Sequence, residues 1–209
     1  SRGQARRVTL EAHAAGGLVA RFAIGDARRH LEAGKLALVA QPDLPGVIGT
    51  PTRGADEAEQ FGVADTGYSQ NAAFLDYDLD GDMDLYLLQN LESDLIPSNY
   101  RPRIMDGSAL NNDQLYRNNG DDSFSNVTRE AGILIEGYGL GIGIADFNAD
   151  GWPDIYVGND YVSNDILYIN NRDGTFTNEI ESRIKHQSLF SMGVDIADIN
   201  NDALADIVT

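Results

Sequence analysis

The sequence predicts an all-β fold built from four-stranded antiparallel units, the blades of a partial β-propeller. Two observations lead to this prediction. A group of motifs recurs with an offset of 52 residues, as between Leu115 and Leu167, and each recurrence contains short apolar runs separated by turn-forming residues. A repeat of this length with four short strands is typical of a propeller blade.

The 52-residue period rests on two pairs of matching segments. Residues 115–124 read Leu-Tyr-Arg-Asn-Asn-Gly-Asp-Asp-Ser-Phe and match Leu-Tyr-Ile-Asn-Asn-Arg-Asp-Gly-Thr-Phe at 167–176. The acidic segments that begin at Asp146 and Asp198 are separated by the same distance. Asp76 lies 70 residues before Asp146, and the 18 additional residues fit within 91–111, which is therefore predicted to be an insertion.

Each repeat is predicted to contain four strands. In the second repeat these are residues 139–145, 155–158, 166–170 and 176–180. The first alternates apolar residues with glycine, which suits a strand that neighbouring backbones approach closely. An acidic loop joins the first two strands, and a tight turn at 171–174 joins the last two, with Asn119-Gly120 as the equivalent turn in the preceding repeat.

The acidic loops carry the pattern of a site for a hard cation. Asp76 to Asp84 holds five carboxylates at alternate positions, and the pattern returns from Asp146 to Asp154 and from Asp198 to Asp206. Side-chain oxygens at positions 1, 3, 5 and 9, with glycine at position 6, allow one short loop to wrap a calcium ion. The repulsion between two close carboxylates is roughly 1 kcal/mol even in water, so a cation bound among them would stabilise each loop.

The same spacing could begin an EF-hand, and two observations argue against it. An EF-hand requires an acidic ligand at position 12 and flanking helices. Position 12 is Leu87 in the first copy and Val157 in the second, and both lie in apolar runs that favour strands. The loops are therefore predicted to join two strands.

These repeats resemble the FG-GAP/VCBS repeats, the calcium-loop blades of integrin-α-like propellers and many secreted bacterial proteins. The resemblance is carried by 144–157 and 197–202, and the Leu-Tyr-x-Asn-Asn motifs together with 126–133 are similar to bacterial relatives of cartilage acidic protein 1. It implies that Ca²⁺ is bound in all three loops, with a backbone carbonyl contributed at position 7. The implied ligands are Asp76, Asp78, Asp80, Asp82 and Asp84; Asp146, Asn148, Asp150, Trp152 and Asp154; and Asp198, Asn200, Asp202, Leu204 and Asp206. Ala203 replaces the glycine of the third loop, so we expect that turn to be strained and its site to be weaker.

Charge divides the chain into two parts. Residues 1–54 carry eight Lys/Arg and four Asp/Glu, whereas residues 55–209 carry seven and 29. We assign 55–209 to the blades and leave 1–54 as an unassigned basic segment, in which 28–39 could form a helix or a helix that leads into a strand. Two clear blades and the opening strands of a third are fewer than a propeller needs, so the chain is expected to be a fragment.

The predicted function is a calcium-binding, non-catalytic module for protein or carbohydrate binding or adhesion, located at the cell surface, in the periplasm or outside the cell. Extracellular calcium modules often bind weakly enough to need abundant calcium. The three histidines are far apart and form no catalytic pair, and the net charge of −18 argues against nucleic-acid binding. The alternative is the propeller of an extracellular hydrolase or lyase that acts on polysaccharide.

The insertion is the predicted contact region for a partner. It should emerge on the face opposite the calcium loops, because it joins the second strand to the third. Tyr100, Arg101 and Arg103 are of residue types that favour recognition sites. A loop without a partner is the alternative reading.

Overall fold

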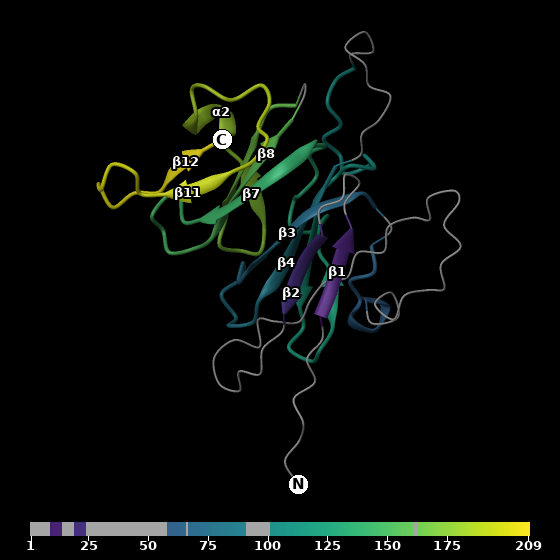
Figure 1. Ribbon diagram of the computed structural model, residues 1–209. Helices are drawn as coiled ribbons and strands as arrows, with labels where there is room; N and C mark the ends of the chain where they lie inside the picture. Colours follow the sequence, from purple (N-terminus) through teal and green to yellow (C-terminus); the bar gives the residue numbers. More distant parts are fainter. Residues whose placement is uncertain (1–8, 14–18, 24–57, 66, 91–100, 161–162) are drawn as a thin grey trace.

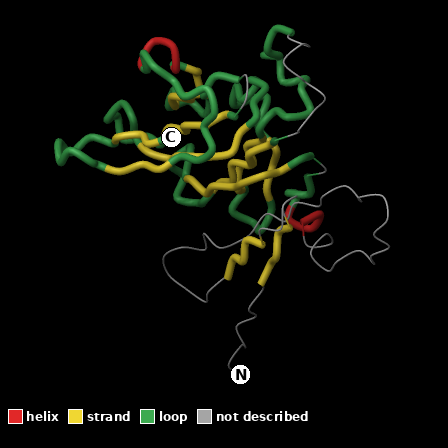
Figure 2. The backbone as a smooth tube through the Cα atoms, turned by 45° about the horizontal axis from the view of Figure 1, so that its top comes forward, coloured by secondary structure: helices red, strands yellow, loops and turns green. Residues whose placement is uncertain are grey.

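The computed structural model describes residues 9–13, 19–23, 58–65, 67–90, 101–160 and 163–209 (Figure 1). The described part consists almost entirely of strands and loops, as the tube in Figure 2 shows, and the all-β prediction is confirmed. None of its helices is long and apolar enough to span a membrane. At the N-terminal end, β1 (Thr9–His13) and β2 (Val19–Ala23) pair as an antiparallel hairpin, and the segment 28–39 lies outside the described residues.

Two four-stranded sheets form the predicted blades. The first has the order β3-β4-β5-β6 and the second the order β10-β9-β8-β7, with neighbouring strands antiparallel. The strands are β3 (Ser69–Leu75), β4 (Asp84–Gln89), β5 (Gln114–Asn118) and β6 (Phe124–Asn126), then β7 (Gly139–Ala145), β8 (Asp154–Asn159), β9 (Ile166–Asn170) and β10 (Phe176–Asn178). The hairpin of β11 (Asp195–Ala197) and β12 (Asp206–Val208) begins a third unit.

The predicted bounds of two strands differ from the observed ones, β8 by one residue at each end and β10 at its C-terminal end. The fourth strand of the second blade was expected to reach Ile180, but β10 ends at Asn178 and the short helix α2 (Ile180–Arg183) follows. The Asn178 side-chain oxygen accepts hydrogen bonds from the backbone N–H groups of Ile180 and Leu167. This local side-chain acceptor turns the chain away from the sheet, because asparagine competes with regular backbone pairing.

The first strands of the three units lie side by side, with β7 in contact with both β3 and β11. The glycines of β7 permit this approach. A Cβ on Gly141 would lie 2.5 Å from the Val194 nitrogen, and one on Gly143 would lie 2.7 Å from Ile196 Cδ1. The prediction that neighbours approach this glycine-rich strand closely is confirmed.

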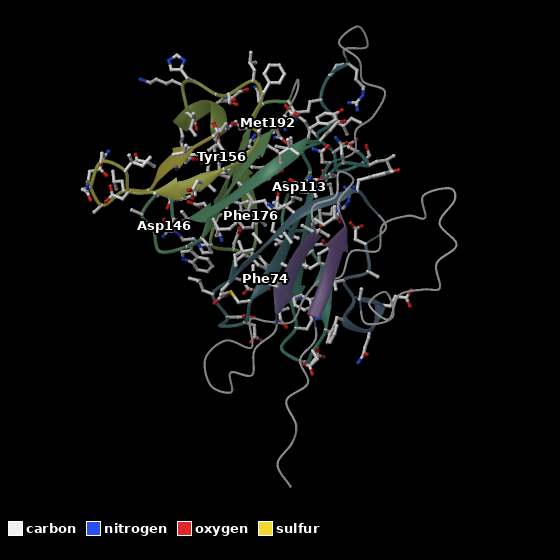
Figure 3. All side chains as sticks on the ribbon, in the orientation of Figure 1. Phe74, Asp113, Asp146, Tyr156, Phe176 and Met192 are labelled. Carbon is white, nitrogen blue, oxygen red and sulfur yellow. The ribbon has the colours of Figure 1, made fainter. Side chains whose placement is uncertain are left out.

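The main core lies between the two complete blades. Leu88 and Leu115 from the first blade and Ile155 and Tyr168 from the second belong to one buried cluster. Because consecutive strands are antiparallel, the β3–β4 and β7–β8 loops lie at one end of the blades. The β4–β5 connection lies at the other end, and the described part of the insertion, 101–111, is therefore on the opposite face as predicted (Figure 1). In Figure 3, Asp113 of this connection lies apart from Asp146 of the β7–β8 loop.

Candidate metal centre

The three acidic loops share one backbone conformation. Positions 4 and 6 have positive φ in every copy, with values of 55° and 96° at Leu79 and Gly81 in the first. In the third copy, position 6 is Ala203, which keeps the turn at φ 66°. The expected strain is therefore present at Ala203, since a side chain is unfavourable at positive φ, but the turn itself is retained.

Two aspartates in each loop hold this backbone. The position 1 carboxylate accepts hydrogen bonds from backbone N–H groups inside the loop, as from Gly81 to Asp76 and from Gly151 to Asp146. The position 9 carboxylate accepts from the N–H of position 2, at 3.0 Å from Tyr77 to Asp84. These bonds fold the loop around its own carboxylates and leave other oxygens available to a cation.

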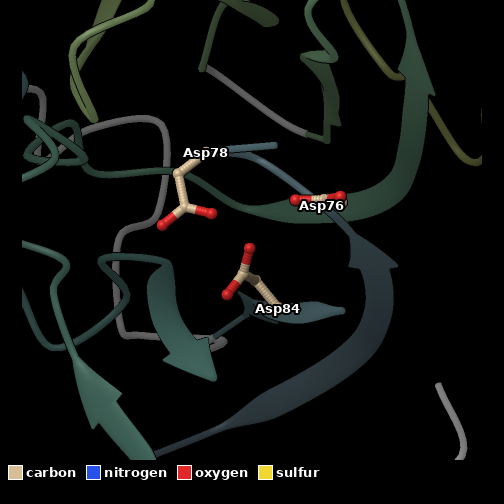
Figure 4. Close-up of side chains that lie close together, drawn as sticks. All are labelled: Asp76, Asp78 and Asp84. Atoms are coloured by element: carbon tan, nitrogen blue, oxygen red, sulfur yellow. The ribbon is translucent and has the colours of Figure 1, made fainter. Parts of the chain in front are cut away.

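The first loop brings three acids together. One carboxylate oxygen from each of Asp76, Asp78 and Asp84 lies within 4.8 Å of the others (Figure 4). Asp76 Oδ1 and Asp78 Oδ1 are buried and have no hydrogen-bond partner. A buried carboxylate oxygen without a partner is costly. The oxygen-only donor set suits Ca²⁺, which would supply the missing partner for both atoms.

The electrostatics of the first loop agree with this geometry. Burial, and to a smaller extent the negative charge of Asp78, raises the pKa of Asp84 to about 7, although the hydrogen bonds from Asn118 and Tyr77 act in the opposite direction. Burial and the neighbouring carboxylate of Asp80 raise the pKa of Asp78. A divalent cation would reverse these effects, because it favours the ionised carboxylates.

Asp80 and Asp82 lie outside the three-acid cluster. Asp80 is exposed, and its Oδ1 accepts the backbone N–H of Asp82 at 2.9 Å. Both residues remain predicted ligands at positions 5 and 7 of the first loop.

The second loop is arranged differently at its centre. Asp150 Oδ1 accepts the Trp152 N–H, and Asp150 Oδ2 accepts from both Asn148 and Arg172. Burial alone would raise the pKa of Asp150, but the hydrogen bonds from Trp152, Asn148 and Arg172 together lower it below its ordinary value. Asp154 is fully buried, and burial raises its pKa.

The third loop repeats the hydrogen bonds that backbone N–H groups donate in the second loop. Asp202 N–H donates to both Asp198 and Asn200, and Leu204 N–H donates to Asp202. Asp206 accepts from Ile199 N–H at 2.9 Å. Apart from Asp206, which is half-buried, these predicted ligands are exposed, so the third loop offers a more solvated set of oxygens than the first.

Sequence reasoning missed the asparagines that tie each loop to its blade. Asn118 and Asn170, the last residues of β5 and β9, donate their backbone N–H groups to Asp84 and Asp154 at 2.8 Å. Asn170 Nδ2 also donates to the Tyr77 carbonyl of the first loop at 2.7 Å. The signal was available in the repeated Leu-Tyr-x-Asn-Asn motif.

A second missed pair lies at the other end of the blades. Asp113 accepts hydrogen bonds from the Tyr86 hydroxyl at 2.7 Å and from the Gln89 N–H at 2.8 Å. Asp165 is its counterpart in the second blade, where it accepts from Tyr156 and Asn159. The motif Asn-Asp-x-Leu-Tyr, which recurs at 112–116 and 164–168, would have identified both aspartates.

Of the predicted partner residues of the insertion, Arg101 and Arg103 lie on this opposite face. Arg101 forms an ion pair with Glu136, and Arg103 Nε donates to the Glu136 backbone carbonyl. The Ile104 N–H donates to Glu136 Oε2 at 2.9 Å. Tyr100 lies outside the described residues. These contacts fasten 101–104 to the segment that precedes β7, and Arg101 keeps 41% of its side chain exposed.

Replacing Glu136 with glutamine should lower the free energy of unfolding by about 2 kcal/mol. The change removes the charge that Arg101 and Arg103 face, and the loss stays below the roughly 3 to 5 kcal/mol of a fully buried pair because Arg101 is partly solvated. Burial alone would raise the pKa of Glu136, but the hydrogen bonds from Arg101 and Ile104 lower it below its ordinary value. The stabilisation by the ionised Glu136 should therefore disappear as the pH falls through that lowered pKa. Urea titration measures the difference, with the exposed Glu130→Gln variant as control. Equal stabilities of Glu136→Gln and Glu130→Gln would contradict a stabilising role of the Glu136 charge.

Comparison with known proteins agrees with the repeat. The sequence model of a family described as FG-GAP-like repeat matches residues 104–157 and again 146–209. The second match spans the second and third acidic loops, and together the matches cover half of the chain. No curated protein matches the sequence.

Proposed function

The chain belongs to the FG-GAP-like repeat family, and from this premise we propose that it is a calcium-stabilised, non-catalytic binding module of the extracellular or periplasmic space. FG-GAP repeats suggest an extracellular propeller-like module, which is consistent with the blade structure described above. Calcium binding, the binding role and the lack of catalysis are the proposed parts.

The first loop carries the calcium proposal. Three carboxylates converge there, and two of their buried oxygens have no hydrogen-bond partner. Asp76, Asp78 and Asp84 would hold the ion, with Asp80 and the Asp82 carbonyl completing the set. Its role would be structural, because the Asp84 carboxylate also accepts from Asn118 of β5 and so connects the loop with the blade.

Calcium should raise the melting temperature of the protein relative to EDTA. At a free concentration 100 times the dissociation constant, each filled site adds about 2.7 kcal/mol to stability. The double variant Asp76→Asn, Asp78→Asn should lose most of the contribution of the first loop. The control carries Glu130→Gln and Glu181→Gln, which change the net charge equally at exposed positions outside the loops. Equal calcium shifts for the loop variant and the wild type would refute a calcium site in the first loop.

The binding surface is proposed on the face opposite the loops. The insertion is held there by backbone hydrogen bonds, from Gly107 to Leu134 and from Glu136 to Ile104, each 2.9 Å long. Met105 and Leu110 are strongly exposed on it, and Arg101 lies nearby in sequence. A fixed loop that presents an arginine and apolar side chains suits recognition of a protein or carbohydrate.

This part is tested with the full chain in calcium on arrays of glycans and extracellular matrix proteins. The variant Met105→Ser, Leu110→Ser should lose any ligand that the wild type retains. Leu204→Ser is the control, because Leu204 is similarly exposed but lies in the third acidic loop. Loss of binding in the control alone would place the ligand on the calcium-loop face.

A further inference from the structure

A cation from a neighbouring turn contacts the second acidic loop. Arg172, in the turn between β9 and β10, donates Nε to Asp150 Oδ2 at 2.9 Å, and its Nη2 lies 2.9 Å from the same oxygen. The Asn148 amide also donates to this oxygen at 2.9 Å. The Asp150 side chain is only 9% exposed, whereas that of Arg172 is 56% exposed. A guanidinium therefore reaches from solvent to a largely buried carboxylate at position 5.

The first loop has no such group in the equivalent turn. Gly120 occupies the position that corresponds to Arg172 at the 52-residue offset, and both residues have positive φ, 73° and 63°. Arginine at positive φ is strained where glycine is not, so the side chain is placed there at a conformational cost. The same turn thus offers a cation to one loop and none to the other.

The two loops also differ in the number of their carboxylates and in how many carboxylate oxygens lack a partner. The first loop has five carboxylates and two buried oxygens without a partner, Asp76 Oδ1 and Asp78 Oδ1. The second has three carboxylates, because Asn148 and Trp152 replace two aspartates, and among the described residues it has no buried side-chain oxygen left without a hydrogen bond. The positive charge nearest to the first loop is that of Arg117, which slightly lowers the pKa of Asp78 but has no ion pair with the loop among the described contacts, whereas Arg172 contacts Asp150 of the second loop directly.

We propose that the Arg172 guanidinium is an intramolecular counter-cation of the second loop, which therefore folds without a divalent ion and binds calcium more weakly than the first. This inference rests on the proposed calcium function and assigns unequal roles to its sites. Calcium stabilisation would come mainly from the first loop. Calcium at the second loop would have to share Asp150 with Arg172 or displace it.

The only tryptophan of the chain allows the second loop to be observed alone. Trp152 lies inside that loop, so a Tb³⁺ ion bound there should emit when tryptophan is excited selectively. Tb³⁺ takes oxygen ligands as calcium does and serves as the probe. The titrations use the full chain with the Asp76→Asn, Asp78→Asn background, which weakens the first loop.

In this background, Arg172→Gln should bind Tb³⁺ at the second loop on the order of tenfold more tightly. Removing one positive charge near a multivalent ion has at least an effect of this size where solvent reaches the charge, as it does at the half-exposed Arg172. Arg183→Gln is the control, since Arg183 lies at the end of α2, is exposed, and pairs with Glu179, which precedes the helix. Displacement of bound Tb³⁺ by calcium should likewise show that Arg172→Gln binds calcium more tightly than Arg183→Gln does.

The outcomes separate this inference from the calcium function. If Arg172→Gln and Arg183→Gln bind Tb³⁺ equally, or if neither variant gives tryptophan-sensitised emission, Arg172 is not what weakens the second loop, and the inference is overturned. The calcium function fails separately, if the wild type shows no calcium-dependent rise in melting temperature. Circular dichroism of Arg172→Gln in EDTA verifies that the variant is folded.

Discussion

Replacing Asn170 with alanine is expected to lower the free energy of unfolding by about 4 kcal/mol, roughly one and a half times the cost of the same change at Asn118, because three side-chain hydrogen bonds are lost instead of two, at about 1 to 1.5 kcal/mol each. Asn170 is 2% exposed, and its side chain donates to the carbonyls of Tyr77 and Pro153 and accepts from the Arg172 N–H. The Tyr77 bond joins the second blade to the first acidic loop across 93 residues of sequence.

Asn118 is the matched control, because it occupies the same position one repeat earlier. Its side chain donates to the Met83 carbonyl and accepts from the Gly120 N–H, both inside its own blade. The difference between the two variants therefore measures the bond between blades. Chemical denaturation of both in calcium gives this difference, and equal losses would show that the Tyr77 bond contributes nothing.

Raising the pH from 5 to 8 in saturating calcium should lower the free energy of unfolding by about 3 kcal/mol, and Asp113→Asn should abolish most of this change. Burial raises the pKa of Asp113 to about 7, partly offset by the hydrogen bonds from Gln89 and Tyr86. The folded protein then holds a proton that the unfolded chain has released above its ordinary pKa of about 4. Stability therefore falls as the pH rises through this window.

Asparagine can keep both contacts of Asp113, since its oxygen can accept the Gln89 N–H and its amide can donate to the Tyr86 oxygen. Saturating calcium is specified because Asp84, whose pKa is raised in the same direction, should then be kept ionised by the ion. The measurement is a series of urea titrations across the pH range. If Asp113→Asn keeps the wild-type dependence of the free energy of unfolding on pH, Asp113 is not the source of that dependence.

Much of the fold follows from patterns that are local in the sequence. Glycine alternation predicted β7 with its observed bounds, and the apolar run after Ile166 predicted β9 likewise. The failure at β10 has the same local origin, because the Asn178 side chain ends the strand although Ile180 continues the apolar pattern. Periodicity shows which residues are buried, but not which polar side chain interrupts the backbone pairing.

The candidate site was predictable only in part. Spacing predicted three cation loops, the resemblance to FG-GAP/VCBS repeats implied their ligands, and the structure brings three of these, Asp76, Asp78 and Asp84, together. Spacing could not predict that Arg172 would contact Asp150, 22 residues earlier, or that Asn170 would bond Tyr77 in the other blade. Such contacts depend on how the turns and blades pack against one another. The 52-residue spacing of the motifs contains no information about that packing.

The carboxylates at the starts of β4 and β8 have a consequence for strand alignment during folding. Both strands are buried along their whole length, so no alternation of inward and outward side chains fixes their register. Asp84 supplies a fixed point, because it accepts N–H groups from Tyr77 and from Asn118 on the neighbouring strand. A slip by one residue would break both bonds and move a carboxylate into the apolar interior. The acid thus selects against misaligned sheets, in addition to its proposed part in binding calcium.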